Sequence, residues 1–406
     1  MTDRRKFLLS LLALYGCRQD GEPQNSSDAS NAAPPVDPPA ATGGALSNIA
    51  AVTPFNTFVE IASPGIDKGN QDPNLGQNTR MAMHYCNKGV WSNGAASLGF
   101  AGLVHIGMDH GISGPADTCS MGRWDDATGT WLPRLPCIGN HGYDHTVIDP
   151  TTGDLYRLMF GVKQPQWVFS ADAGVYKWDG AAFQLFASFP PSDPATQLVA
   201  ASGEWWSGPL PPGVGGSTGA LVWYNGNSGA CHFLNPDTKA WTSVWTAFPD
   251  MAGYYGNVCA YSRKHNCLVL GTGNIYDGTP DGSGGLGPLS RQTYRVNANL
   301  TSTRLPDAPH HVGVYSGMNL NTGPDGIAYT VGFNEVWKLD PSGAGTWSKL
   351  RDKPARIWNQ NDHAAGYSVR SPYGIVYISS APGATNHGDD DLPQEVTMHL
   401  LRLAAA

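Results

Sequence analysis

The chain has 406 residues, of which 14% are charged, and it carries a formal net charge of −8 at pH 7. It contains no run of basic residues, and together with the acidic net charge this argues against nucleic acid as a partner. The 50 glycines and 31 prolines, with few strongly periodic helical stretches, are typical of many short strands joined by turns.

The first 17 residues, MTDRRKFLLSLLALYGC, have the pattern of a targeting segment. Arg4 and Arg5 precede an apolar run that reaches Leu14 and is too short to span a bilayer. The segment resembles a twin-arginine export signal, and its end at Cys17 resembles a lipobox, where the cysteine becomes the lipidated N-terminus. These resemblances imply a protein exported to the periplasm or cell surface and held at an envelope membrane by its lipid alone. Plain cleavage without lipid is the alternative.

Residues 18–47 are rich in Pro, Ser, Asn, Gly and Ala and contain almost no large apolar side chain. Such a segment cannot bury enough surface to order itself, so it is predicted to be a disordered linker. Residues 48–406 are predicted to form one all-β domain, and we expect a monomer.

The cysteine count predicts disulfides. If Cys17 carries lipid, six cysteines remain, and an even number in an exported chain favours pairing. Cys259 and Cys267 bracket AYSRKHN, which reads as a hairpin, so we expect them to form a disulfide. A zinc site is the rival interpretation, although no close Cys-x-x-Cys pair is present. The pairing of the others stays open: Cys86, Cys119, Cys137 and Cys231.

A repeat is the strongest signal in the chain. Five segments share a strand that ends in an Asp or Asn turn, followed by a strand that closes on proline. These segments are residues 122–136, 175–190, 231–249, 294–306 and 336–354. Their closing prolines are 48 to 59 residues apart, which fits one four-stranded propeller blade per repeat. An opening pair of strands precedes each closing pair.

The two ends of the repeat array complement each other. The last unit, residues 359–406, has three predicted strands and no outer strand, whereas residues 56–64 form an orphan outer strand. Phe58 stands there at the position of Trp131, Trp241 and Trp347, which we expect in the core between blades. Pairing of the two ends would close the ring and remove an open sheet edge. The sequence thus predicts a six-bladed β-propeller, or seven blades if residues 65–136 contain two. Through its turns and tryptophans, the domain resembles kelch-like propellers.

The segments that enter the innermost strands carry polar and aromatic side chains. His141, Tyr143 and His145 alternate, so an extended chain would point all three the same way. The entries to other blades contain Arg80, Tyr254, Tyr255, Asn257, His311, Arg356 and His363. We expect these side chains to converge at one mouth of the channel as an active or binding site. The competing interpretation is structural, since inner strands also use polar groups to hold water and to join blades.

Adjacent tryptophans, Trp205 and Trp206, precede a Gly- and Pro-rich insertion in the third blade. On a loop they would either stack on sugar rings or cap the edge of a blade, and both interpretations remain open.

The layout is similar to that of propeller polysaccharide lyases. This resemblance implies His141 or His145 as base, Tyr254 or Tyr255 as acid, and Arg80 or Arg356 as the clamp for a uronate carboxylate. The expected substrate-binding residues are Arg80, Tyr143, Trp205, Trp206, Asn257, His311 and His363.

Two other functions are compatible with the same layout. A propeller with variable loops suits a non-catalytic module that binds a glycan or a protein. A copper radical oxidase of the galactose oxidase kind would use the Tyr and His residues, but part of that copper site comes from a further domain with no counterpart in residues 48–406. The sequence requires no cofactor, and a divalent metal held by His141 and His145 is left open.

Overall fold

The computed structural model contains 26 strands and one short helix within the residues that it describes. These residues are 43–62, 88–94, 97–107, 120–136, 145–159, 173–190, 201–225, 228–245, 253–255, 257–271, 274–275, 291–310, 320–331, 334–357, 366–380 and 396–404. All of them belong to one compact unit, Pro34–Ala406.

Twenty-four of the strands form six antiparallel sheets of four strands, here called blades 1 to 6. Blade 1 contains β2 (Val90–Asn93), β3 (Ala101–Gly107), β4 (Ser120–Asp125) and β5 (Thr130–Pro136). Blade 2 contains β6 (Thr146–Ile148), β7 (Leu155–Met159), β8 (Gly174–Trp178) and β9 (Phe183–Ser188). Blade 3 contains β10 (Ala201–Trp206), β11 (Ala220–Asn225), β12 (Ala230–Leu234) and β13 (Trp241–Trp245).

The second half of the chain continues the pattern. Blade 4 contains β15 (Val258–Ser262), β16 (Cys267–Gly271), β18 (Thr293–Asn297) and β19 (Ser302–Leu305). Blade 5 contains β20 (Leu320–Thr322), β21 (Ala328–Val331), β22 (Glu335–Asp340) and β23 (Thr346–Asp352). Blade 6 contains β24 (Gly366–Ser371), β25 (Gly374–Ser380), β26 (Val396–Arg402) and β1 (Thr57–Ile61). A separate pair joins β14 (Gly253–Tyr255) to β17 (Asn274–Ile275).

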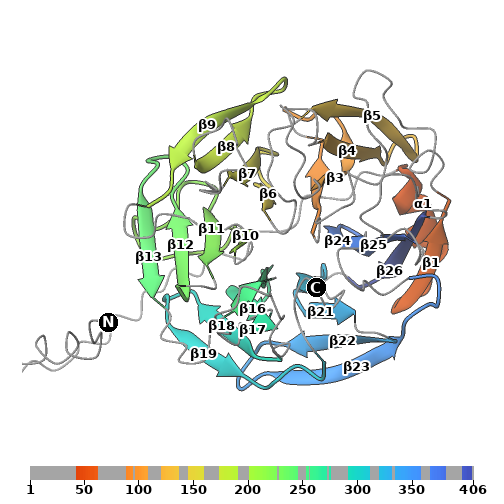
Figure 1. The fold of residues 1–406 in the computed structure, drawn as a ribbon. Coiled ribbons are helices and arrows are strands. Elements are labelled where there is room, and N and C mark those ends of the chain that lie inside the picture. Colours follow the sequence, from red (N-terminus) through yellow and green to blue (C-terminus); the bar gives the residue numbers. More distant parts are fainter. Residues whose placement is uncertain are drawn as a thin grey trace, which may run out of the picture. The chain divides into compact units, whose positions relative to one another are not determined.

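The blades are arranged in a ring around a central axis (Figure 1). The innermost strands contact one another in the cyclic order β2, β6, β10, β15, β20, β24 and back to β2. Each blade presents its first strand to the axis and its last strand to the outside. The predicted six-bladed β-propeller is therefore confirmed.

Blade 6 closes the ring with strands from both ends of the domain. β1 pairs antiparallel with β26, which places Phe58 opposite Leu401 and Glu60 opposite His399. The predicted union of the N-terminal strand with the last repeat is thus confirmed. β1 covers the edge of β26 that would otherwise be open and gives this blade the same four strands as the others.

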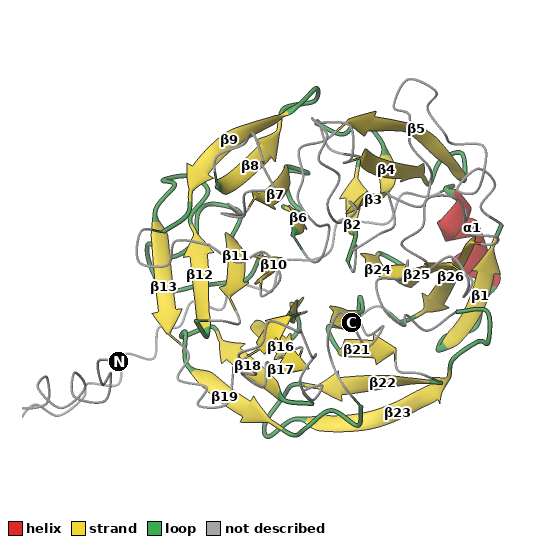
Figure 2. Ribbon diagram, viewed as in Figure 1, coloured by secondary structure: helices red, strands yellow, loops and turns green. Residues whose placement is uncertain are grey.

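The helix α1 (Ala45–Val52) docks on the outside of the ring beside β1 and β26 (Figure 2). Asp126 accepts hydrogen bonds from the first two backbone N–H groups of the helix. Its carbonyl accepts that of Ala45, and its carboxylate accepts that of Leu46 at 2.7 Å. Gly44 permits this contact, since a Cβ there would lie 2.1 Å from the Asp126 carboxylate. Leu46 and Ala50 are buried in the core shared by blades 1 and 6. Across the described residues, no helix is both long enough and apolar enough to span a membrane.

The outer-strand tryptophans pack between blades, as predicted. Trp131 is buried, and Trp241 and Trp347 pack against neighbouring core clusters. The Trp241 indole donates to the carbonyl of Ser188 at 2.8 Å, and Trp347 donates to that of Pro306 at 3.1 Å. Each indole therefore joins its own blade to the end of the preceding one.

The predicted disulfide between Cys259 and Cys267 is wrong. Both are buried free thiols, as is Cys231. The hairpin register pairs Cys259 with Leu270 and Cys267 with Ser262, so the cysteines are offset by about 10 Å along the ladder. This offset exceeds the Cα separation of about 7 Å that a disulfide can bridge.

Candidate functional site

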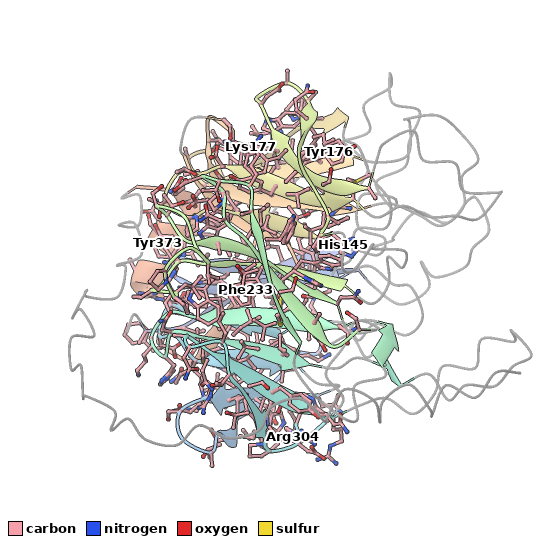
Figure 3. All side chains as sticks on the ribbon, turned by 90° about the vertical axis from the view of Figure 1, so that its left-hand side faces the viewer. His145, Tyr176, Lys177, Phe233, Arg304 and Tyr373 are labelled. Atoms are coloured by element: carbon pink, nitrogen blue, oxygen red, sulfur yellow. The ribbon has the colours of Figure 1, made fainter. Side chains whose placement is uncertain are left out.

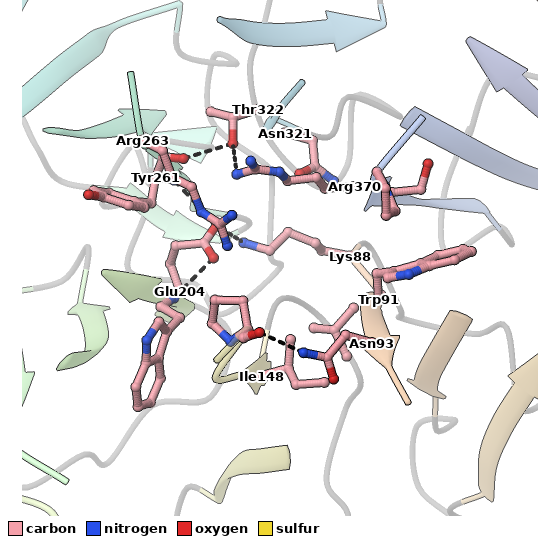
Figure 4. Close-up of a pocket in the computed structure, with 16 residues that line it drawn as sticks. Lys88, Trp91, Asn93, Ile148, Glu204, Tyr261, Arg263, Asn321, Thr322 and Arg370 are labelled. Carbon is pink, nitrogen blue, oxygen red and sulfur yellow. Dashed lines mark hydrogen bonds and ion pairs between the residues drawn. The ribbon is translucent and has the colours of Figure 1, made fainter. Parts of the chain in front are cut away.

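A cavity of about 100 Å³ lies at the centre of the ring, and we call it the axial cavity (Figure 4). This volume is several times the roughly 10–15 Å³ that one water needs on the same measure. Each of the six blades contributes to its lining. One lining residue from each blade, in order, is Lys88, Ile148, Glu204, Arg263, Asn321 and Arg370.

The axial cavity lies toward the hairpin-turn side of the ring. Its lining comes mainly from the carboxyl ends of the inner strands, including Arg370 and Ser371 at the end of β24. Tyr373 follows in the next turn, whereas His145 directly precedes β6. These two residues lie toward opposite sides of the ring in Figure 3. The cavity is therefore separated from the strand entries where the sequence predicts the site.

Lys88 crosses the axis and ties four blades together. Its backbone forms a bridge to Ser368 of β24. Its ammonium group donates to the carbonyls of Gly203 at 3.1 Å and Cys259 at 2.9 Å, and to the Glu204 carboxylate at 3.0 Å. An ammonium has three N–H donors, and these three acceptors match them. With 6% of its side chain exposed, Lys88 acts as a structural cross-brace.

Glu204 is the acidic residue of the cavity lining. Its Oε1 accepts the backbone N–H of Trp205 at 3.0 Å. Its Oε2 accepts from Lys88 and, at 3.4 Å, from the backbone N–H of Tyr261. The Glu204 side chain is 21% exposed, so part of the carboxylate surface remains accessible.

Two arginines add positive charge to the same cavity. Burial, followed by the charge of Arg370, lowers the pKa of Arg263 to about 9. Burial also lowers the pKa of Arg370, while the charge of Glu204 acts in the opposite direction. Arg370 donates to the Thr322 hydroxyl at 3.2 Å. In Figure 4 the Arg263 side chain extends toward Lys88 and Glu204, whereas the Arg370 side chain extends toward Thr322. Three cations and one carboxylate line the cavity, so it favours an anionic ligand.

The rest of the lining combines amide, hydroxyl and indole groups. Asn93 donates to the carbonyl of Pro150 at 2.7 Å, and Asn321 donates to the Ser368 hydroxyl at 3.3 Å. Trp91 and Trp205 are also among the lining residues, although the Trp205 indole stacks on Tyr156 in the core between blades 2 and 3. A mostly apolar wall with a few oriented polar groups is the composition of small-molecule sites.

Several predicted site residues can be placed only in part. Tyr254 and Tyr255 lie on β14, the short strand before blade 4. His145 and Asn257 directly precede β6 and β15, at the predicted strand entries, and are 0% and 1% exposed. The other predicted residues lie outside the described part of the chain: Cys17, Arg80, His141, Tyr143, His311 and His363.

The structure corrects the expected positions of three residues. Trp205 and Trp206 lie on β10 instead of a loop, and both are buried. Trp206 packs against Phe233 and Tyr261, so it belongs to the core between blades 3 and 4. Arg356 is not at the channel. It forms an ion pair with Glu60 of β1 at 2.5 Å, and β1 is the outermost strand of blade 6.

Sequence reasoning missed the charged groups of the axial cavity. Arg263 directly follows β15, and Arg370 is the second-last residue of β24. Both therefore lie near the first hairpin turn of their blades, Arg263 in the turn and Arg370 in the last paired residues before it. Arginines near those turns were the signal that sequence reasoning could have used. Lys88 carries no such signal, because it precedes the first strand of its blade.

No group of three or more His, Cys, Asp or Glu side chains that could hold a metal ion occurs among the described residues. The predicted metal site involves His141, which lies outside them, and it stays a prediction.

No family model and no curated protein sequence matches this chain. Among the solved structures that it resembles is a protein of unknown function from Bacteroides thetaiotaomicron, with 10% identity, 84% of this chain and 75% of that chain covered, and a TM-score of 0.48. Virginiamycin B lyase from Staphylococcus aureus shows 12% identity, with 75% and 80% covered and a TM-score of 0.39. The calcium-binding protein regucalcin from Agrobacterium tumefaciens shows 12% identity, with 80% and 91% covered and a TM-score of 0.43. Similarity at this level transfers no activity, so function has to be inferred from the residues of this chain.

Proposed function

We propose that this propeller binds a small carboxylate-bearing ligand of the acidic carbohydrate class in the axial cavity. The observation that carries the proposal is the presence of Arg263 and Arg370 in one cavity, where their charges repel each other. An anion between them would offset this repulsion, and a guanidinium matches a carboxylate with two parallel hydrogen bonds. The interaction is stronger there than in water, because the surroundings are poorly polarisable.

The neutral lining suits a hydroxylated ligand. Asn93, Asn321 and Thr322 supply amide and hydroxyl groups, and Val90, Ile148 and Pro150 supply apolar surface. A sugar ring presents both kinds of surface, with hydroxyl groups at its edge and C–H groups on its faces. These features support a carbohydrate over a purely apolar acid.

Polysaccharide lyase activity is the catalytic alternative to binding alone. Abstraction of the proton next to a uronate carboxylate requires neutralisation of that carboxylate, and the two arginines fit this role. The base and acid proposed from the sequence, His141 or His145 with Tyr254 or Tyr255, belong to the strand entries. A substrate reaching both ends of the channel would have to pass Lys88, so we favour binding without elimination.

The envelope location is proposed from the signal sequence alone. Export through the twin-arginine signal and lipidation of Cys17 would hold the propeller at the membrane by residues 18–47. Intact mass of the N-terminal peptide from membranes would show a diacylglyceryl cysteine; a free N-terminus at residue 18 or later would overturn this part.

Calorimetric titration of the full-length protein with D-glucuronate tests the binding proposal. We expect saturable 1:1 binding that weakens at least tenfold in Arg263→Met and in Arg370→Met, because each loses a charged hydrogen-bond donor. Arg304→Met is the matched control, since Arg304 pairs with Asp307 on the exposed edge of blade 4. Equal binding by the parent and both cavity variants would refute the proposal.

The catalytic alternative needs a separate assay. Incubation with uronate-containing polysaccharides, followed by the ultraviolet absorbance of unsaturated product, would detect elimination. Product formed by the parent and lost in His141→Ala and His145→Ala would establish a lyase and reverse our preference for binding alone.

A further inference from the structure

We infer that Glu204 makes the axial cavity selective for a hydroxylated acid, in which a hydroxyl group lies close to the carboxylate, over anions that have no hydroxyl donor. This inference rests on the proposed function and specifies which acidic ligands the cavity accepts. The two arginines account for affinity toward any small anion. Glu204 pairs with the buried ammonium of Lys88, and because it also lines the cavity, its carboxylate can act on a ligand bound there.

Glu204 is fixed in position by groups on three sides. Lys88 and the backbone N–H groups of Trp205 and Tyr261 donate to its two oxygens at 3.0 to 3.4 Å. A carboxylate offers about four acceptor positions, so three donors leave room for another. The side chain is more exposed than that of Lys88, at 21% against 6%, and it lines the axial cavity. The remaining acceptor position is therefore accessible to a ligand.

The charges of the cavity determine where the carboxylate and the hydroxyl group of a ligand would lie. Glu204 acts electrostatically on Arg370, and Arg370 acts on Arg263. A ligand carboxylate is attracted to the arginines and repelled by Glu204, so it binds on the arginine side. A hydroxyl group close to that carboxylate, such as the 4-hydroxyl of a hexuronate, would then face Glu204 and donate to it.

An anion without a hydrogen-bond donor should bind this cavity less tightly for two reasons. It meets the negative charge of Glu204 without a bridging proton, and it fills the cavity without donating to that carboxylate. A hydrogen bond to a charged group contributes more than an average hydrogen bond, and the donor-free anion lacks this contribution. A site built around a ligand hydroxyl therefore rejects the analogue that lacks it far more strongly than a size difference would.

The test compares two monocarboxylates of similar ring size on the full-length protein by calorimetry. D-Glucuronate carries hydroxyl groups, and cyclohexanecarboxylate carries none. We expect glucuronate to bind roughly tenfold to a hundredfold more tightly, the range of a hydrogen bond to a charged group. Sulfate, an anion with no hydrogen, serves as a second donor-free ligand and should also bind weakly.

Two variants isolate the role of Glu204. Glu204→Met removes the acceptor, and the double variant Lys88→Met/Glu204→Met removes it without leaving a buried ammonium unpaired. In the folded variants, we expect the preference for glucuronate to fall below threefold. Glu335→Met is the matched control, since Glu335 pairs with Lys349 on the surface of blade 5. Circular dichroism confirms that each variant is folded.

The outcomes separate the two proposals. Arginine-dependent binding of glucuronate and cyclohexanecarboxylate with equal affinity would overturn the role of Glu204 and leave the proposed function standing. A preference for glucuronate that persists in the folded double variant would also overturn the role of Glu204 and leave the proposed function standing. Absence of arginine-dependent binding of any anion would overturn the proposed function itself.

Discussion

Replacement of Lys88 by methionine should be among the most destabilising single changes in this propeller. The ammonium of Lys88 binds two backbone carbonyls and the Glu204 carboxylate from a position with 6% exposure. Breaking a buried ion pair by removal of one partner typically costs about 3–5 kcal/mol. Glu204 keeps two backbone donors and is 21% exposed, so we expect a loss of about 3 kcal/mol, at the lower end of that range.

The double variant Lys88→Met/Glu204→Met should lose less stability than the sum of its two single variants. It contains no unpaired charge, and methionine retains much of the volume of each side chain. The carbonyls of Gly203 and Cys259 lose the ammonium donor, and the backbone N–H groups of Trp205 and Tyr261 lose the carboxylate acceptor, at roughly 1 kcal/mol each. We therefore expect the double variant to lose about 4 kcal/mol, whereas each single variant leaves one charge unpaired and should lose about 3 kcal/mol or more.

Urea denaturation followed by tryptophan fluorescence measures these free energies. Lys349→Met serves as the control, because Lys349 forms its ion pairs on the surface and should contribute nothing measurable. A loss below 1 kcal/mol for Lys88→Met, or strictly additive losses in the double variant, would refute the cross-brace role of Lys88.

Two further predictions concern stability with pH and the state of the thiols. Burial, partly offset by Glu60, lowers the pKa of His399, so the folded state binds fewer protons than the unfolded state at acidic pH. The free energy of unfolding should therefore fall as pH drops below about 6.5, the pKa of an unfolded histidine. Urea denaturation at several pH values should show a shallower fall in His399→Gln. The same dependence on pH in the parent and the variant would contradict this prediction. Cys259 and Cys267 should both react with iodoacetamide in the denatured, unreduced chain, as detected by mass spectrometry. If both cysteines stay unmodified, they form a disulfide and this prediction is wrong.

The architecture could be predicted because its signals are local and repeated. Five of the units end in a closing pair of strands with an Asx turn and a terminal proline, and the sixth is completed by the displaced N-terminal strand that closes the ring. The position of Phe58 in β1 matches that of Trp131 in β5, each being the second residue of its strand. The cysteines show the limit of this reasoning. Their pairing depends on exact register across the hairpin, which the sequence of the turn does not specify.

The candidate site was harder to predict because it is assembled from all six blades. Arg263 and Arg370 are more than 100 positions apart in the sequence and meet only when the inner strands converge on the axis. Trp205 and Trp206 looked like loop residues, because a Gly- and Pro-rich segment follows them directly, yet both belong to β10. Arg356 was assigned to a strand entry by its position in the repeat, and its pairing with Glu60 depends on the closure of blade 6.

The polar character of the axis follows in part from the propeller itself. The inner strands are sheet edges, and their unpaired carbonyls need donors wherever water is excluded. Lys88 meets this need for Gly203 and Cys259, and the Thr322 hydroxyl meets it for Tyr261 at 2.7 Å. One cation and a few hydroxyl groups therefore have a structural explanation. Two more arginines in the same cavity repel each other, and an anionic ligand would offset this repulsion.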